Sequence, residues 1–95
     1  MGMGTNQIIS KIIPVLLRYK VKKAELFGSA ARGELRSNSD VDVLVKLPEE
    51  ASLLDLGGLY MDLKEALGRE VDVVTYGSVN TRLAPYVFSN TIKVI

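Results

Sequence analysis

Two aspartates stand two residues apart in the run DVDVLVKL at residues 40–47, which otherwise has the composition of a buried strand. Side chains two residues apart on a strand point to the same face, about 6–7 Å apart, so Asp40 and Asp42 are expected to form a negative pair beside an apolar core. Like charges in a partly desolvated site push one acid toward its neutral form unless a cation or a basic side chain neutralises them. The pair therefore indicates a site for a positive group.

A third acid, Asp72, lies in a second alternating run, EVDVVT at residues 70–75. If the two strands are neighbours in a sheet, Asp72 completes a cluster of three carboxylates with Asp40 and Asp42. The chain contains no histidine and no cysteine, so any metal must be held by oxygen, which favours Mg²⁺ or Mn²⁺ over zinc. Taken alone, each acid is better explained as a structural residue, capping a turn or facing solvent at the end or edge of a strand, and both interpretations stay open.

A glycine-serine pair, Gly28 and Ser29, follows an apolar run and precedes a short segment expected to be helical. A glycine turn that opens a helix offers free backbone N–H groups and the positive end of the helix dipole to a phosphate. Most glycines in such a place simply make a turn, so the signal gains weight from the acids close by. A phosphate-binding turn beside paired carboxylates predicts a site for a metal and a nucleotide together.

The hydrophobic periodicity predicts an α+β fold, with helices packed on a small mixed β-sheet in one domain that covers residues 1–95. The expected helices are residues 5–19, 30–34 and 52–67 with a short one near Pro85, and the expected strands are residues 24–27, 40–47, 70–75 and 91–95. Thr5 or Asn6 is expected to cap the first helix, and Ser52 with Asp55 to cap the third.

The stretch LFGSAARGE at residues 26–34, followed by SDVDVLV at residues 39–45, resembles the signature of the nucleotidyltransferase superfamily with the DNA polymerase beta type of fold. Within it the chain is most similar to the minimal nucleotidyltransferase (MNT) branch. A Gly-Ser pair, ten intervening residues and then Asp-x-Asp form a highly specific combination. GREVDVVT at residues 68–75 resembles the strand that carries the third acid of the family. The resemblance covers nearly the whole chain and implies a polymerase beta palm-like fold.

The resemblance implies roles for the three acids. Asp40 and Asp42 match the residues that ligate two divalent ions, Mg²⁺ or Mn²⁺. Asp72 matches the third acid, which helps to bind one metal and can take the proton from the attacking hydroxyl. Two metals and three carboxylates are also what general chemistry expects for such a transfer, because the pair of ions stabilises both the attacking and the leaving oxygens.

The resemblance also implies a nucleotide-binding set, with ATP as the nucleotide donor. Gly28 and Ser29 match the positions that bind the phosphates, with the Ser29 hydroxyl and nearby backbone groups as donors. Arg32 lies inside the motif and is a weaker candidate for a phosphate contact, since a salt bridge to Glu25 or Glu34 explains it equally well. Ser39, directly before the paired acids, is a further weak candidate.

The MNT branch implies a function as well. A stand-alone chain like this one resembles the MNT half of two-gene pairs whose other half is a helical HEPN protein. In such pairs the MNT protein acts as the antitoxin, in some cases by transferring AMP from ATP to a tyrosine of its partner. The expected activity is therefore nucleotidyl transfer to a hydroxyl of a HEPN-type toxin. One alternative is a non-catalytic antitoxin that masks its partner by direct binding. Another is transfer to a small molecule such as an aminoglycoside, against which the absence of an acceptor domain argues.

Composition sets the remaining expectations. A chain without cysteine and without a long apolar run is expected to be cytoplasmic and to stay off the membrane. Residues 1–36 carry seven basic and two acidic side chains, a net +5, whereas residues 37–95 carry five and nine, a net −4. No basic stripe with interleaved aromatic residues is present, which argues against nucleic acid as a partner. The acceptor, the base of the nucleotide and any homo-oligomer are left open by the sequence.

Overall fold

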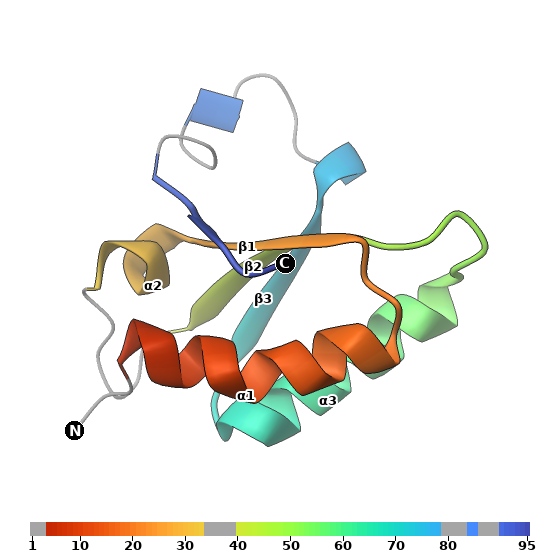
Figure 1. Cartoon of the computed structure of the whole chain (residues 1–95). Coiled ribbons are helices and arrows are strands. Elements are labelled where there is room, and N and C mark those ends of the chain that lie inside the picture. The colour runs from red at the N-terminus through yellow and green to blue at the C-terminus, as the bar shows by residue number, and fades with distance from the viewer. Residues whose placement is uncertain (1–3, 34–39, 79–83, 86–89) are drawn as a thin grey trace.

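The fold is that of a mixed sheet with helices packed on it, as expected from the sequence (Figure 1). The computed structural model describes residues 4–33, 40–78, 84–85 and 90–95. Its elements in chain order are α1 (Thr5–Arg18), β1 (Lys23–Phe27), α2 (Gly28–Arg32), β2 (Val41–Lys46), α3 (Leu53–Leu67), β3 (Val71–Thr75), the short 3-10 turn η1 (Tyr76–Ser78) and β4 (Ile92–Lys93).

The four strands form one sheet in the order β3-β2-β1-β4. Strand β1 runs antiparallel to both β2 and β4, whereas β2 and β3 are parallel to each other. This order leaves β3 at one edge of the sheet and places β2, with its paired acids, beside it. A parallel pair needs a crossover connection, and α3 supplies it between β2 and β3.

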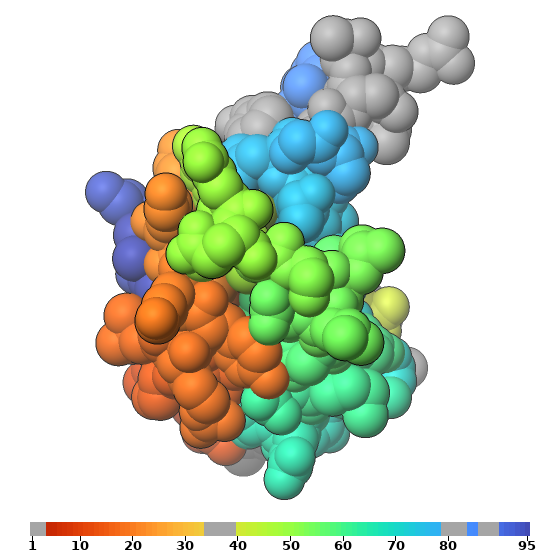
Figure 2. All heavy atoms as spheres, turned by 90° about the vertical axis from the view of Figure 1, so that its right-hand side faces the viewer, coloured from red at the N-terminus to blue at the C-terminus, as the bar shows by residue number. Residues whose placement is uncertain are grey.

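Helices α1 and α3 cover one face of the sheet, and Figure 2 shows the two lying side by side. The core between these layers is made of aliphatic side chains that repeat at helical and strand spacing. Its largest contributors are Ile8, Ile12 and Leu16 of α1, Leu26 of β1, Val41, Val43 and Val45 of β2, and Leu59 and Leu63 of α3. Because side chains alternate along a strand, the intervening residues of β2 face the other side of the sheet, called here the open face.

The start of α1 differs from the expected capping. Gly4 occupies the N-cap position without a side-chain hydrogen bond, so neither Thr5 nor Asn6 caps the helix. The Thr5 hydroxyl instead donates to the carbonyl oxygen of Ala30 at 3.0 Å. Thr5, which local sequence rules assign to a cap, therefore ties the first turn of α1 to α2, the short helix that begins with the Gly-Ser pair.

The expected cap of α3 is confirmed. The Ser52 hydroxyl accepts from the Asp55 backbone N–H at 3.4 Å, and the Asp55 carboxylate accepts from the Ser52 backbone N–H at 2.8 Å. Gly68 ends the helix in the left-handed conformation, with φ 65°. Both signals are local in sequence, which is why periodicity and capping rules locate α3 to within a residue.

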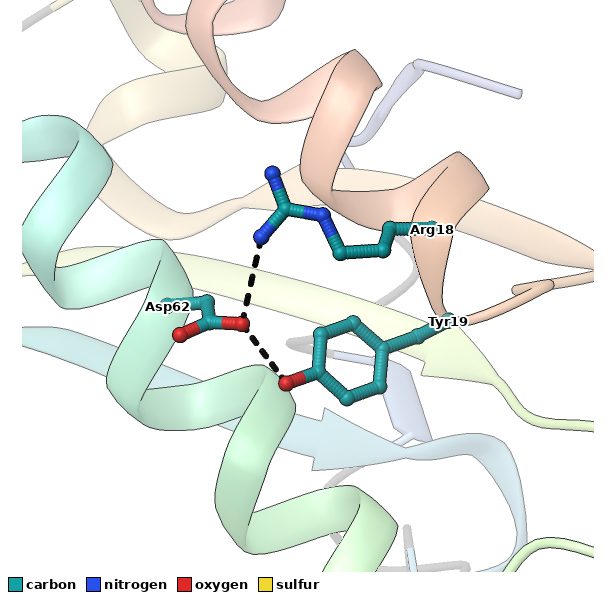
Figure 3. Close-up of polar contacts among 3 residues, drawn as sticks. All are labelled: Arg18, Tyr19 and Asp62. Atoms are coloured by element: carbon teal, nitrogen blue, oxygen red, sulfur yellow. Dashed lines mark hydrogen bonds and ion pairs between the residues drawn. The ribbon is translucent and has the colours of Figure 1, made fainter.

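The two helices are held together at one end by a polar contact (Figure 3). The Tyr19 hydroxyl, at the end of α1, donates to Asp62 of α3 at 2.6 Å, and Arg18 pairs with the same carboxylate at 3.4 Å. A Cβ at Gly58 would lie 2.8 Å from the Tyr19 hydroxyl oxygen, so the absence of a side chain there lets the tyrosine ring lie against α3. Among the described residues, no helix is long and apolar enough to cross a membrane.

The two adjacent glycines of α3 should therefore respond differently to alanine. Gly57→Ala places its Cβ in open space and should raise the free energy of unfolding by up to about 1 kcal/mol, the usual gain in helix propensity. Gly58→Ala has the same propensity gain but crowds the Tyr19 hydroxyl, so it should be the less stable of the two by at least about 1 kcal/mol. Urea unfolding of both variants measures this difference. Equal stability of the two variants would show that Tyr19 does not pack closely on α3.

Candidate active site

The two parallel strands bring the acids of β2 and β3 together. Asp42 and Asp72 are direct Cα partners in the β2–β3 pairing, so both lie on the open face near the start of their strands. The sequence predicted that Asp72 lies beside Asp40 and Asp42, and the strand pairing places it beside Asp42. Asp42 is partly buried, whereas Asp72 on the edge strand is exposed.

The glycine of the Gly-Ser pair meets the same carboxylate from the other side. Strand β1 pairs Phe27 with Asp42, so the chain leaves the sheet at Gly28 directly beside that aspartate. Gly28 has φ 67°, and a Cβ built on it would overlap Oδ2 of Asp42. Two independent constraints, a left-handed backbone and the lack of space, require glycine at this position.

The electrostatics of the site are unfavourable to the ionised acid. Burial raises the pKa of Asp42 to about 6, and the negative charges of Asp72 and Asp40 add to the effect. The positive charge of Arg32, at the end of α2, acts in the opposite direction. A carboxylate that is desolvated and faces two other acids is stabilised by a cation in front of it. With oxygen as the only donor type among the acids, the site fits a hard divalent cation.

Asp40 differs from the other two acids in lying outside the strands. It is exposed and directly precedes β2, and the first backbone hydrogen bond at this edge joins the Val41 N–H to the Glu70 carbonyl at 3.0 Å. Within the described residues, no three acidic side chains are arranged to hold a metal ion as they stand. The expected convergence of three carboxylates is therefore not present in this conformation, in which only Asp42 and Asp72 are paired by the sheet.

The remaining predicted residues fall in three groups. Ser29 is partly buried in the first turn of α2, which begins at Gly28 rather than at Ala30 as expected. Arg32 is exposed and close enough for its charge to act on Asp42. Ser39 lies outside the described residues, as does Glu34, one of the two glutamates considered as partners of Arg32.

Sequence patterns did not indicate a polar contact on the open face. Glu25 of β1 accepts hydrogen bonds from the Tyr76 hydroxyl at 2.5 Å and from the Thr91 hydroxyl at 3.2 Å. The three residues lie 51 and 66 positions apart, so no local motif links them. Burial and the hydrogen bond to Glu25 raise the pKa of Tyr76 above its ordinary range. The contact fastens the chain after β3 and the last strand to the centre of the sheet.

Comparison with known proteins identifies the class of this fold and site. The model of the family described as nucleotidyltransferase domain matches residues 9–94. The chain belongs to this family, and it is accordingly a transferase of nucleotidyl groups.

Individual relatives are similar over most of the chain. A Methanocaldococcus jannaschii protein whose name includes the words protein adenylyltransferase is 46% identical over 93 residues, 98% of this chain and 100% of the relative. The protein adenylyltransferase MntA of Thermococcus cleftensis is 38% identical over 77 residues, 81% of this chain and 78% of the relative. Both names describe transfer of an adenylyl group to a protein.

Solved structures agree with the sequence relatives. A structure described with the words minimal nucleotidyltransferase superposes with a TM-score of 0.81 at 32% identity, covering 95% of each chain. A toxin–antitoxin structure with AMP-PNP gives a TM-score of 0.78 at 29% identity, covering 92% of this chain and 72% of the other. A complex of a tri-AMPylated Shewanella oneidensis HEPN toxin with an MNT antitoxin gives 0.73 at 25% identity, covering 96% and 71%. The expected palm-like nucleotidyltransferase fold is confirmed.

Gly28 and Gly33 have similar left-handed backbone angles, but only Gly28 lies against another side chain. Replacing each by alanine should therefore distinguish the cost of backbone strain from the cost of crowding. Gly33→Ala, with φ 71° and open space around the new Cβ, should lower the free energy of unfolding by about 1 kcal/mol. Gly28→Ala should lower it by roughly 1–3 kcal/mol more, because its Cβ also displaces the Asp42 carboxylate. Denaturant unfolding measures both. The extra loss should vanish when Asp42 is also replaced by alanine, and its persistence in that background would contradict the proposed contact.

The raised pKa of Asp42 predicts how the stability of the metal-free protein depends on pH. The folded state holds this proton up to about pH 6, whereas the unfolded chain loses it near the ordinary value of 3.8, so stability falls as the pH rises through that window and is level above it. Asp42→Asn removes this slope and should make the protein more stable at pH 7, by on the order of 1 kcal/mol, since the half-exposed carboxylate is partly screened.

Urea unfolding in EDTA at pH 4.5 and pH 7 measures this effect. Glu65→Gln, which removes an exposed acid of α3, is the matched control and should keep the slope of the wild type. A large loss of stability in Asp42→Asn at pH 7 would mean that the ionised carboxylate supports the fold.

Proposed function

We propose that this protein transfers AMP from ATP to a tyrosine hydroxyl of a helical HEPN-type partner and thereby acts as its antitoxin. Membership of the nucleotidyltransferase family supports the transfer, and the protein adenylyltransferase names of the relatives support a protein acceptor over a small molecule such as an aminoglycoside. The similarity to an MNT antitoxin in complex with an AMPylated HEPN toxin supports the nature of the partner. The observation that carries the proposal is the packing of Gly28 against Asp42, with Asp72 next to it on the neighbouring strand.

The three acids have different positions and so different proposed roles. Asp42, partly buried between Gly28 and Asp72, is the residue best placed to hold a cation against the phosphates. Asp40 is proposed as the second ligand, which its exposed position before β2 leaves able to turn toward the site. When bound, two Mg²⁺ or Mn²⁺ ions would offset charge on the attacking and leaving oxygens.

Asp72 is open to an approaching acceptor, because it is exposed on β3, the edge strand of the sheet. We assign to it the removal of the proton from the attacking hydroxyl, together with a share in binding one metal. Gly28 and Ser29, at the start of α2, are placed to contact the phosphates, and the charge of Arg32 lies on the same side of the site. Ser39 keeps its proposed place as a weaker phosphate contact.

Replacing Asp42 should mainly affect ATP binding, whereas replacing Asp72 should mainly affect the transfer of AMP. ATP binding measured by calorimetry should require Mg²⁺ in the wild type and be lost in Asp42→Asn, because that variant removes the proposed metal ligand between the strands. Asp72→Asn should keep most of the ATP affinity but lose AMP transfer at least a hundredfold, since a base acts on the transition state more than on bound nucleotide. Equal ATP affinity of wild type and Asp42→Asn would remove the basis of the proposed site.

Mass spectrometry of the mixed proteins tests the function itself. With ATP and Mg²⁺, a HEPN-type partner protein should gain one or more AMP adducts on tyrosine. The Asp40→Asn/Asp42→Asn variant should add none, and Glu65→Gln should act like the wild type. If the double variant neutralises the toxin as well as the wild type does, with no adduct formed, the protein works by masking its partner through contact.

A further inference from the structure

A hollow lies at the opposite end of the parallel strands from the acids. Asp42 and Asp72 lie near the start of β2 and β3, whereas the last residues of these strands border a cavity of about 470 Å³. Its polar lining comes from Lys23, Lys46, Thr75 and Tyr76, and its apolar side chain is that of Leu47. Figure 2 looks at this end of the molecule, where the loop after β2 lies next to the segment that follows β3.

The cavity is separate from the candidate active site. Lys46 is four residues beyond Asp42 on β2, which corresponds to about 13 Å along an extended strand. None of the residues that line the cavity belongs to the Gly-Ser turn or to the three acids. A ligand in this cavity would therefore meet different side chains from those proposed to bind ATP.

Two lysines form a like-charge pair at the cavity. Lys23 of β1 and Lys46 of β2 are direct Cα partners, so both ammonium groups leave the sheet on the open face. Like charges directly opposite each other destabilise an antiparallel pair. Neither lysine has an ion pair within the described part of the chain. An anion placed between the two ammonium groups would relieve their repulsion.

The nearby acids are engaged elsewhere or lie in the adjacent loop. Glu25, on the same face of β1, accepts the hydrogen bonds of Tyr76 and Thr91. Glu49 and Glu50, in the loop after β2, are exposed and have no ion pair with a described residue. The donors to Glu25 are neutral hydroxyls, so this acid offsets part of the positive charge of the pair, but among the described residues no carboxylate forms an ion pair with either lysine.

The aromatic wall of the cavity is held in place before any ligand binds. The Tyr76 hydroxyl donates to Glu25 at 2.5 Å, and the Lys23 ammonium lies over the tyrosine ring, 5.1 Å from its centre. A side chain fixed at both its ring and its hydroxyl loses little further freedom on binding. The volume falls within the range of small-molecule sites, roughly 300–1,000 Å³, whose walls are mainly apolar with a few polar groups.

We propose that this cavity binds a small organic anion, in which a phosphate or carboxylate group is carried on a flat apolar ring. The anionic group pairs with Lys46 and Lys23, and the ring lies against Leu47 and the side of Tyr76. Lysine ammonium groups suit a single anionic centre approached from several directions, as in a monophosphate. The site stands independently of adenylyl transfer, since it uses no acid of the active site and no divalent ion.

Residue-resolved NMR of the whole chain tests this site, with AMP as the probe and EDTA present to exclude divalent ions. The amide signals of Lys46, Thr75 and Gly77 should shift and saturate together. The Lys23→Gln/Lys46→Gln variant should bind AMP at least tenfold more weakly, and its stability should stay close to that of the wild type, because it loses both the like-charge repulsion and the contact of Lys23 with the Tyr76 ring. Lys11→Gln, which removes an exposed lysine of α1, should bind as the wild type does.

Titrations with different ligands test separately the contributions of the ring and of the anionic group to binding. Adenosine and inorganic phosphate should each bind at least tenfold more weakly than AMP if ring and charge both contribute. Phenyl phosphate and benzoate, compared at equal concentration, decide between a phosphate and a carboxylate. Shifts confined to Gly28, Ser29 and Asp42, or an AMP affinity unchanged in the double lysine variant, would overturn the proposal, as would adenosine binding as tightly as AMP.

Discussion

The close approach of a backbone turn to a carboxylate is the constraint on which this molecule depends. Gly28 leaves β1 with a left-handed backbone at the place where Asp42 of β2 comes up beside it. Any other residue would both strain the turn and push the acid away. The register of β1 on β2 and of β2 on β3 must then be correct to the residue, because a slip by one would turn both aspartates into the core.

The packing of α1 and α3 on the sheet stabilises the fold against the unfavourable burial of the Asp42 carboxylate beside Gly28. Val41, Val43 and Val45 are fully buried against α1 and α3, so every second position of β2 is fixed by packing. The alternate positions are then free to carry charge on the open face. Thr5 adds a tie between α1 and α2 through Ala30, which joins the packed layer to the turn at the site. A rigid apolar layer thus holds an electrostatically unfavourable arrangement in place.

Charge is distributed unevenly along the open face. The aspartates lie near the start of the parallel strands, and the pair Lys23 and Lys46 lies near the end of β2. The hydrogen bond from Tyr76, which follows β3, to Glu25 of β1 lies between these two clusters. Each cluster brings like charges together. A cation beside Asp42, whose pKa is raised, would relieve the repulsion among the aspartates, and an anion in the cavity would relieve that between the lysines. The two proposed sites, of opposite charge, thus share one face of the sheet with a fixed polar contact between them.

The sequence alone determined the elements and the family, because their signals are local. Capping and periodicity located α3, alternation located β2 and β3, and the spacing from Gly28 to Asp42 carried the resemblance to nucleotidyltransferases. Only the tertiary structure decided which acids meet, since pairing Asp42 with Asp72 but leaving Asp40 outside the sheet depends on where the parallel ladder begins. The contact of Glu25 with Tyr76 and the lysine pair at the cavity likewise follow from strand register between distant segments. Periodicity within a single segment contains no information about that register.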